Sequence, residues 1–255
     1  MPPFDVANDV YIQLKDAFSR LVAEHDLARD EMDVTCSRLT AQQAIGDPQH
    51  TDYPIIRGRE YMVAASFRGA VGQAFTDTFF GDFRGTVSDV IGLPLNDNHE
   101  RAVFVAGLNA VLCSVGLIEG TEHCRDDEPV ECARRLPEYL SAKHPEARNI
   151  LVAGFQPRMI EALSRQYDVR VIDLDPDNIG ASKFGVLIDG PDMALSHLAW
   201  CDLALVTGTT LVNGTMSDYW SEKPVVFYGV TIAGAAHLLG LERFCFCAPS
   251  LVDRG

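Results

Sequence analysis

Hydrophobic residues near the N-terminus recur at the spacing of an amphipathic helix. Five of them lie three to four positions apart, with charged residues between them: Val6, Val10, Leu14, Phe18 and Leu21. This spacing predicts a helix that buries one face. From about residue 31 to residue 79 the pattern changes to short runs rich in Val, Ile, Phe and Thr. The runs 61–67 and 70–75, separated by Arg68 and Gly69, predict an antiparallel hairpin.

Two further helices are predicted before the middle of the chain. Thr86 is typical of a helix N-cap, and residues 98–101 open an apolar helix that extends to about residue 115. A polar stretch then surrounds a helix-like segment at residues 130–143. We therefore expect three parts: an α+β domain over 1–125, a linker with a connecting helix over 126–147, and a second domain over 148–255.

The second half of the chain alternates strand and helix patterns. Short apolar runs occupy residues 149–154, 169–174, 203–207, 224–228 and 244–247. Helical patterns lie between most of them, at 157–167, 213–220 and 233–241, and a long loop follows residue 174. Strands separated by helices predict a parallel sheet covered on both faces. The expected fold class is α/β, with a Rossmann-like second domain.

Ligands of open parallel sheets bind beyond the carboxyl ends of the strands, so the loops that follow the strands deserve inspection. Gly154 follows the first strand, but Phe155 and Gln156 replace the further glycines that a dinucleotide-binding loop requires. This argues against ordinary NAD binding. Asp173 ends the next strand, where it is either a ligand-binding acid or a turn residue.

The loop over residues 207–215 is the richest in polar groups. Its candidate ligand-binding residues are Thr207, Gly208, Thr209, Thr210, Asn213 and Thr215. Glycine permits close backbone approach, hydroxyls donate and accept, and backbone amides at Gly208 to Thr210 and at Gly154 are candidates to hold an anionic or carbonyl edge. The alternative is that Asn213 or Thr215 caps a helix and the threonines stabilise the turn.

This loop, with the strand before it, resembles the signature of the DUF364 family. Residues 101–112 and 72–77 are similar to the DUF4213 domain that precedes it in many members. The resemblance implies an enolase N-terminal-like first domain, a Rossmann-like second domain and a site in the cleft between them. The family is described as heavy-metal chelation proteins, which points to a transition-metal ion as the cofactor. Gly229 matches the turn after the fourth strand, where relatives carry a G-P-S-like sequence that is absent here.

Cysteine and histidine offer two local metal-site candidates. Cys245 and Cys247 share a face if they lie on a strand, although the surrounding apolar residues equally favour a core strand. His123 and Cys124 precede Cys132 by about eight residues, but no fourth ligand is evident. Neither spacing is a standard zinc motif.

Composition narrows the choice of partners. The 255 residues carry a net charge of -15 and show no basic patch, so nucleic acid is a poor partner. The apolar stretch 102–118 is too short for a membrane span, which argues against a membrane protein. The first ten residues lack a signal-peptide pattern, so we expect a cytoplasmic protein. The sequence leaves open whether copies associate into a homo-oligomer.

Three functions remain open at this stage. The first is a protein that binds a small molecule or metal chelate, in cofactor or metallophore metabolism, with Thr76, Asp77 and Asn109 completing the site from the first domain. The second is an enzyme acting on a nucleotide or pterin-like molecule through Asp77 or Asp173. The third is a structural or assembly module, which predicts an empty cleft.

Overall fold

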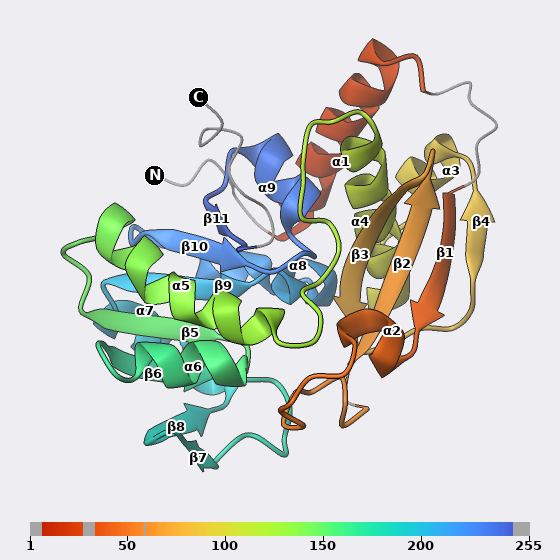
Figure 1. Cartoon of the computed structure of the whole chain (residues 1–255). Coiled ribbons are helices and arrows are strands. Elements are labelled where there is room, and N and C mark those ends of the chain that lie inside the picture. The colour runs from red at the N-terminus through yellow and green to blue at the C-terminus, as the bar shows by residue number, and fades with distance from the viewer. Residues whose placement is uncertain (1–6, 28–33, 59, 247–255) are drawn as a thin grey trace.

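The computed structural model describes residues 7–27, 34–58 and 60–246, and these form two β-sheets with helices around them (Figure 1). The N-terminal sheet is antiparallel, with strand order β3-β2-β1-β4. Its strands are β1 (Val34–Leu39), β2 (Tyr61–Phe67), β3 (Ala70–Thr76) and β4 (Phe83–Gly85). The expected hairpin is confirmed, because β2 and β3 pair from Tyr61 with Thr76 to Phe67 with Ala70.

Four helices accompany this sheet: α1 (Ala7–Glu24), α2 (Ala41–Ile45), α3 (Val87–Gly92) and α4 (Asn98–Ser114). The expected start of α3 is confirmed, since Thr86 and Asp89 form a reciprocal capping box. Asp97 caps α4 by accepting from the backbone amide of Glu100. Local side-chain hydrogen bonds therefore determine where these two helices begin.

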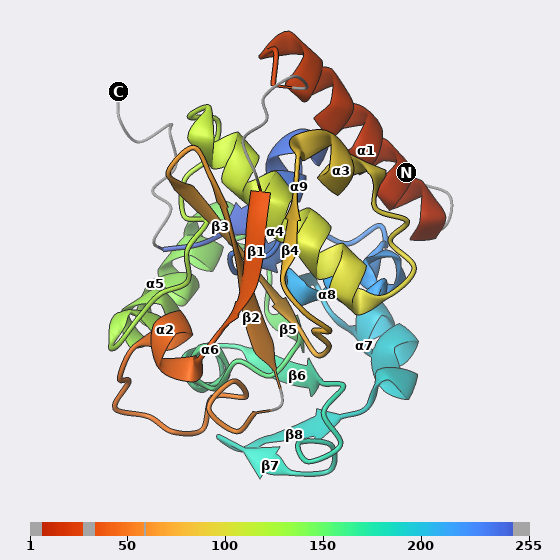
Figure 2. The same cartoon turned by 90° about the vertical axis from the view of Figure 1, so that its right-hand side faces the viewer.

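Helix α4 crosses one face of the N-terminal sheet at close range (Figure 2). A Cβ atom at Gly72 of β3 would lie only 2.2 Å from the backbone nitrogen of Ala110. Glycine is therefore needed where the strand meets the helix. Residues 102–112 of α4 are buried on every side. The face of this helix that points away from the N-terminal sheet is covered by α8 (Thr209–Asn213) and α9 (Ala233–Leu239), from the C-terminal half of the chain.

The C-terminal sheet has the order β11-β10-β9-β5-β6-β8-β7 and is parallel apart from β7. Its strands are β5 (Asn149–Ala153), β6 (Asp168–Ile172), β7 (Ser182–Lys183), β8 (Val186–Asp189), β9 (Leu203–Thr207), β10 (Val225–Tyr228) and β11 (Arg243–Phe244). The helices are α5 (Glu128–Lys143), α6 (Pro157–Leu163), η1 (Pro191–Met193), α7 (Ala194–Trp200), α8 (Thr209–Asn213), η2 (Met216–Tyr219) and α9 (Ala233–Leu239). The expected α/β fold with a parallel sheet is confirmed.

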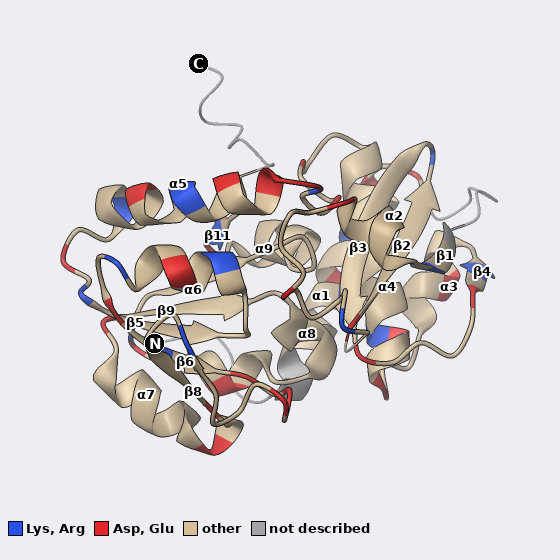
Figure 3. Ribbon diagram, turned by 60° about the horizontal axis from the view of Figure 1, so that its bottom comes forward, with Lys and Arg blue, Asp and Glu red and all other residues tan. Residues whose placement is uncertain are grey.

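Both faces of the parallel sheet are buried. Successive residues of a strand point to opposite faces, so Ile150 packs on the side of α5 and α6, whereas Leu151 packs on the side of α7 and α9. The segment 126–147, expected to be a linker with a connecting helix, consists largely of helix α5, which packs on the sheet. Acidic and basic positions interleave on its exposed side (Figure 3), where Glu131 pairs with Arg134 and Arg135.

Three predictions of local structure were wrong. The expected helix over 213–220 is replaced by α8, which ends where Gly214 adopts a left-handed φ of 71°, followed by the short η2. The expected long loop after residue 174 contains β8 and α7. Strand β11 ends at Phe244, and Cys247 lies outside the described residues.

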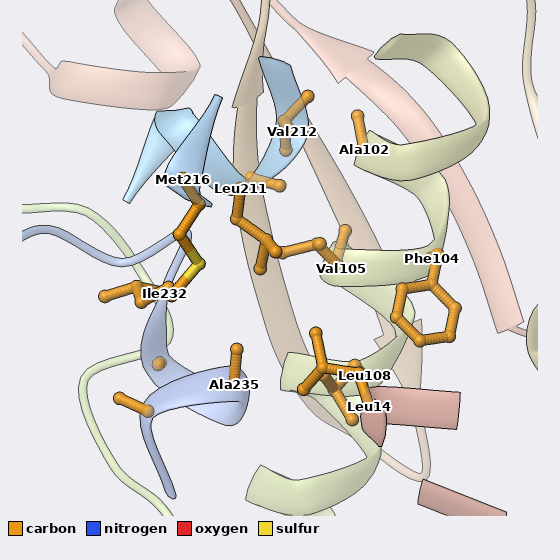
Figure 4. Close-up of a cluster of buried hydrophobic side chains, with 14 of the residues drawn as sticks. Leu14, Ala102, Phe104, Val105, Leu108, Leu211, Val212, Met216, Ile232 and Ala235 are labelled. Carbon is orange, nitrogen blue, oxygen red and sulfur yellow. The ribbon is translucent and has the colours of Figure 1, made fainter. Parts of the chain in front are cut away.

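One hydrophobic cluster extends through both halves of the molecule. Figure 4 shows Leu211 and Val105 pointing toward one another, with Met216 and Ile232 beside them. Phe104 of α4 also contacts Phe18 of α1 edge to face, with 6.1 Å between ring centroids. The two sheets are separate, but this hydrophobic core extends across the boundaries between 1–125, 126–147 and 148–255. The division of the chain into these domains therefore stays a prediction. None of the described helices is both long and apolar enough to cross a membrane.

Candidate functional site

A cavity of about 380 Å³ opens at the carboxyl edge of the parallel sheet. Four of the expected site residues follow or end its strands and line this cavity: Gly154 after β5, Asp173 after β6, Thr207 at the end of β9 and Gly229 after β10. This is the edge where ligands of open α/β sheets bind. The neighbouring Thr209, Thr210, Asn213 and Thr215 line it as well.

The opposite wall comes from the N-terminal half and from the connection between the halves. Asp77 and His123, both of them candidates from the sequence, are joined there by four residues that the sequence did not indicate: Tyr53, Ile55, Glu60 and Phe75. Glu60 and Tyr53 belong to an irregular segment before β2, and no periodic pattern marked them. The cavity therefore lies between the two sheets and is lined by both.

Among the residues that the structure describes, four carboxylates line this cavity: Glu60, Asp77, Asp173 and Asp175. Burial, followed by the negative charges of Asp173, Asp175 and Asp77, raises the pKa of Glu60 to about 7. Burial also raises the pKa of Asp173 above its ordinary value, against the opposing effect of the hydrogen bonds that it accepts. Glu60 therefore holds its proton to a higher pH than an ordinary glutamate does.

Asp173 is held in place by donors on its own loops. Its Oδ2 accepts from the backbone amide of Phe155 at 2.6 Å, and its Oδ1 accepts from the amide of Asp175 at 2.8 Å. Nδ2 of Asn178 donates to the same Oδ1 at 3.2 Å. Asp173 thus joins the loops after β5 and β6, which gives it a structural role at the cavity wall.

Asp77 and Asn213 are linked by a residue that the sequence analysis missed as part of the site. Nδ2 of Asn98, at the first position of α4, donates to Oδ1 of Asp77 at 2.8 Å and to Oδ1 of Asn213 at 3.4 Å. Arg101 donates in turn to Oδ1 of Asn98 at 3.1 Å. The only sequence signal at Asn98 was the start of a helix.

The amide role expected for Gly208, Thr209 and Gly154 is corrected by the structure, whereas that of Thr210 stays a prediction. The amide of Gly208 donates to the carbonyl of Tyr228 at 2.9 Å, and that of Gly154 donates to the carbonyl of Ile172 at 2.8 Å. The amide of Thr209 donates to Oγ1 of Thr207. These groups are consumed within the fold, so side chains supply most of the polar lining.

Three expected site residues do not line the cavity. Gly208 packs against Ile232, whose backbone nitrogen would lie 2.7 Å from an added Cβ. Thr76 is fully buried, and its hydroxyl donates to the carbonyl of Thr78 at 2.9 Å. Asn109 is also fully buried, where it joins α4 to both halves.

Aromatic side chains contribute to the apolar part of the wall. The hydroxyl of Tyr228 donates to the carbonyl of Gly154 at 3.0 Å, and burial raises the pKa of this phenol. Burial likewise raises the pKa of Tyr219 to about 12. Both phenols are therefore neutral at physiological pH. Phe75 and Phe155 complete this surface from the two halves.

Soft metal ligands are present on one side of the cavity but are not assembled into a metal centre. His123, Cys124, Cys132 and Cys245 all line it. Nδ1 of His123 donates to the carbonyl of Cys124 at 2.6 Å, and burial lowers the pKa of His123, which favours the neutral ring. Within residues 7–27, 34–58 and 60–246, no three His, Cys, Asp or Glu side chains are grouped so as to hold a metal ion. The described donors thus do not fit a metal centre built by this chain alone.

Comparison with known proteins supports the fold. The chain covers 79% of a DUF364 protein of unknown function from Pyrococcus horikoshii, with 87% of this chain aligned, 12% identity and a TM-score of 0.52. A second protein of that family, from Desulfitobacterium hafniense, aligns over 70% of this chain and 72% of its own, with 14% identity and a TM-score of 0.49. No curated protein matches the sequence. The model of the DUF364 family, described as "Putative heavy-metal chelation", matches residues 140–238, so the C-terminal half is similar to that family.

Proposed function

We propose that this chain binds a small molecule or a metal chelate in the cavity between its two sheets, in cofactor or metallophore metabolism. The main support for this proposal is the cavity itself, which has a volume of about 380 Å³, lies at the carboxyl edge of the parallel sheet and is lined by residues of both halves. The description of the similar family as heavy-metal chelation proteins also supports a metal complex. A chelate brings its own metal ligands, and therefore needs only matching polar and apolar walls.

A second candidate function is an enzyme whose proton-transfer group is Glu60. A carboxyl with a pKa of about 7 exchanges protons readily at neutral pH, which is the property required of a general acid or base. This assigns to Glu60 the role that the sequence analysis gave to Asp77 or Asp173. The two functions differ in their readout, since an enzyme converts the bound molecule and a binding protein returns it unchanged.

The test is native mass spectrometry of the protein purified from its own host, combined with elemental analysis. Leu174 lines the cavity and is 51% exposed, so Leu174→Trp is expected to place a larger side chain at the cavity rim without disturbing the core. Leu195 is 80% exposed and lies away from the cavity, so Leu195→Trp is the matched control.

The expected result is a bound mass that the Leu195→Trp protein retains and the Leu174→Trp protein loses. Metal that is lost together with that mass would identify a chelate. An equal mass in both variants would place the ligand elsewhere, and the complete absence of a bound mass from all three proteins would contradict the proposal.

A further inference from the structure

We infer that the occupant of the cavity carries a positively charged organic group, such as an ammonium, amidinium or guanidinium, attached to an apolar body. This inference rests on the proposed function and specifies the chemistry of its ligand. It is carried by the charge, the unsatisfied polar groups and the apolar surface of the same cavity.

The charged side chains of the described residues that line the cavity are all acidic. Glu60, Asp77, Asp173 and Asp175 line the cavity, whereas none of the described residues that line it is a lysine or an arginine. A partly enclosed space lined by carboxylates attracts cations and repels anions. A ligand with an exposed phosphate or carboxylate would therefore meet several like charges, and no base among the described lining residues would compensate them.

Glu60 is the carboxylate in this group that lacks a partner. Asp77 accepts hydrogen bonds from Asn98 and Thr78, and Asp173 accepts from three donors. By contrast, burial and three neighbouring carboxylates raise the pKa of Glu60. No hydrogen-bond donor or cation among the described residues stabilises its negative charge. A cationic N–H group of a ligand would supply both the charge and the hydrogen bond that Glu60 lacks.

A second polar group on the same wall is also unsatisfied. Tyr53 is 7% exposed and lines the cavity, and its hydroxyl has no hydrogen-bond partner in the described structure. Buried hydroxyls are normally hydrogen-bonded. An occupant with hydrogen-bonding groups would satisfy this hydroxyl. The charged groups that act on this hydroxyl are Arg158, Asp52 and Asp127 and not the four carboxylates, so it belongs to a second polar region of the same wall.

The apolar surface argues for an organic cation. Phe75, Phe155, Tyr219 and Tyr228 line the cavity beside the carboxylates. A bare inorganic cation gains little from such a wall, whereas an organic cation buries apolar area against it and places its charge near aromatic faces. The combination therefore selects a molecule with one charged end and one apolar end.

Three probes of nearly equal shape test the charge: benzamidinium, benzamide and benzoate. Their binding to the full chain is measured at pH 8 by isothermal titration calorimetry and by the shift in melting temperature, with nickel ion as a fourth probe. We expect benzamidinium to bind about tenfold more tightly than benzamide, and benzoate to bind least. Glu60→Gln should remove most of the preference for benzamidinium, whereas Glu146→Gln, an exposed carboxyl outside the cavity, should preserve it.

The outcomes separate this inference from the proposed function. If benzamide or benzoate binds as tightly as benzamidinium, and Leu174→Trp weakens that binding, the cavity binds ligands but the charge assignment is wrong. If nickel alone stabilises the protein and benzamidinium does not, the organic cation is likewise wrong. If none of the four probes binds, both the inference and the proposed function fail.

Discussion

Asn109 accepts a hydrogen bond on its Oδ1 from the backbone amide of Gly234, at 2.7 Å, in the fully buried centre of the molecule. Its Nδ2 donates to the carbonyls of Gln73, at 3.0 Å, and Val230, at 3.1 Å. One side chain thus joins α4, β3 and the start of α9. The ligand-binding role predicted for Asn109 is replaced by a structural one, since its polar atoms are used within the fold.

Asn109→Ala should therefore destabilise the whole protein. The change leaves the amide of Gly234 and two carbonyls without their partner, and each unsatisfied buried group costs about 1–3 kcal/mol. We expect the free energy of unfolding to fall by about 3 kcal/mol or more in urea titrations. The exposed Asn96→Ala is the control, with an expected change below about 0.5 kcal/mol. A similar small change for Asn109→Ala would contradict the assignment.

Gly72→Ala tests the close approach of α4 to β3. The added Cβ would lie 2.2 Å from the backbone nitrogen of Ala110 and 2.3 Å from the carbonyl oxygen of Ala106, so backbone must move. Overpacking of this kind costs about 1–3 kcal/mol, and more when backbone resists. Gly92→Ala, at the end of α3 with open space around it, is the matched control and should be neutral or stabilising. Equal melting temperatures of the two variants would show that the contact is looser than described.

Glu60 should make stability depend on pH in a defined direction. Its pKa is about 7 in the folded protein, against about 4.3 in an unfolded chain, so the folded state holds the proton more strongly. The contribution of Glu60 to stability is therefore greatest at about pH 4 and declines as the pH rises through 7. Asp77, Asp173 and Asp175 are the charges that face it.

The corresponding variant is Glu60→Gln, compared with the wild type by urea unfolding at pH 5 and pH 8. We expect the free energy of unfolding of the variant, relative to that of the wild type, to be higher at pH 8 than at pH 5. The reason is that glutamine avoids the cost of the buried charge that Glu60 acquires at the higher pH. The exposed Glu146→Gln should show no such gain. A gain at pH 5 that disappears at pH 8 would reverse the sign and refute the raised pKa.

Asn98→Ala should weaken binding of benzamidinium more than it weakens the fold. Asn98 does not line the cavity but holds Asp77 and Asn213, which do. Without this support we expect about fivefold weaker binding, corresponding to about 1 kcal/mol, and a change in unfolding free energy of similar size or smaller. Calorimetry and urea unfolding on the same preparation separate the two effects. Unchanged affinity would show that Asn98 does not position the carboxylate.

Local patterns were sufficient to predict the hairpin of β2 and β3 and the helix α4. In each case the signal lies within a short stretch, such as the turn at Arg68 and Gly69 or the start at Asn98. The helix predicted over 213–220 failed because Gly214 ends α8 in a left-handed conformation. Its sequence allowed either a helix before this glycine or one after it, and packing of Leu211 and Val212 into the core favoured the former.

The candidate site could be predicted on one side only. Strand-end rules selected Gly154, Asp173 and Thr207 because a parallel sheet brings its carboxyl ends together. Glu60 and Tyr53 lie in an irregular segment whose path depends on tertiary contacts, including the ion pair of Asp52 with Arg158 at 2.7 Å. Such long-range contacts leave no periodic trace in the sequence, so the opposite wall was missed.

The shared core has a consequence for dissecting the molecule. Leu211, Met216 and Ile232 complete their packing on α4, a helix that follows the N-terminal sheet along the chain. A fragment limited to residues 148–255 would present this apolar face to water and should aggregate or associate rather than fold alone. A chimaera that combines one half of this chain with the other half of a distant relative would also need matching substitutions on α4, because both halves pack on that helix. The two halves therefore depend on one hydrophobic core for their stability, although they contain separate sheets.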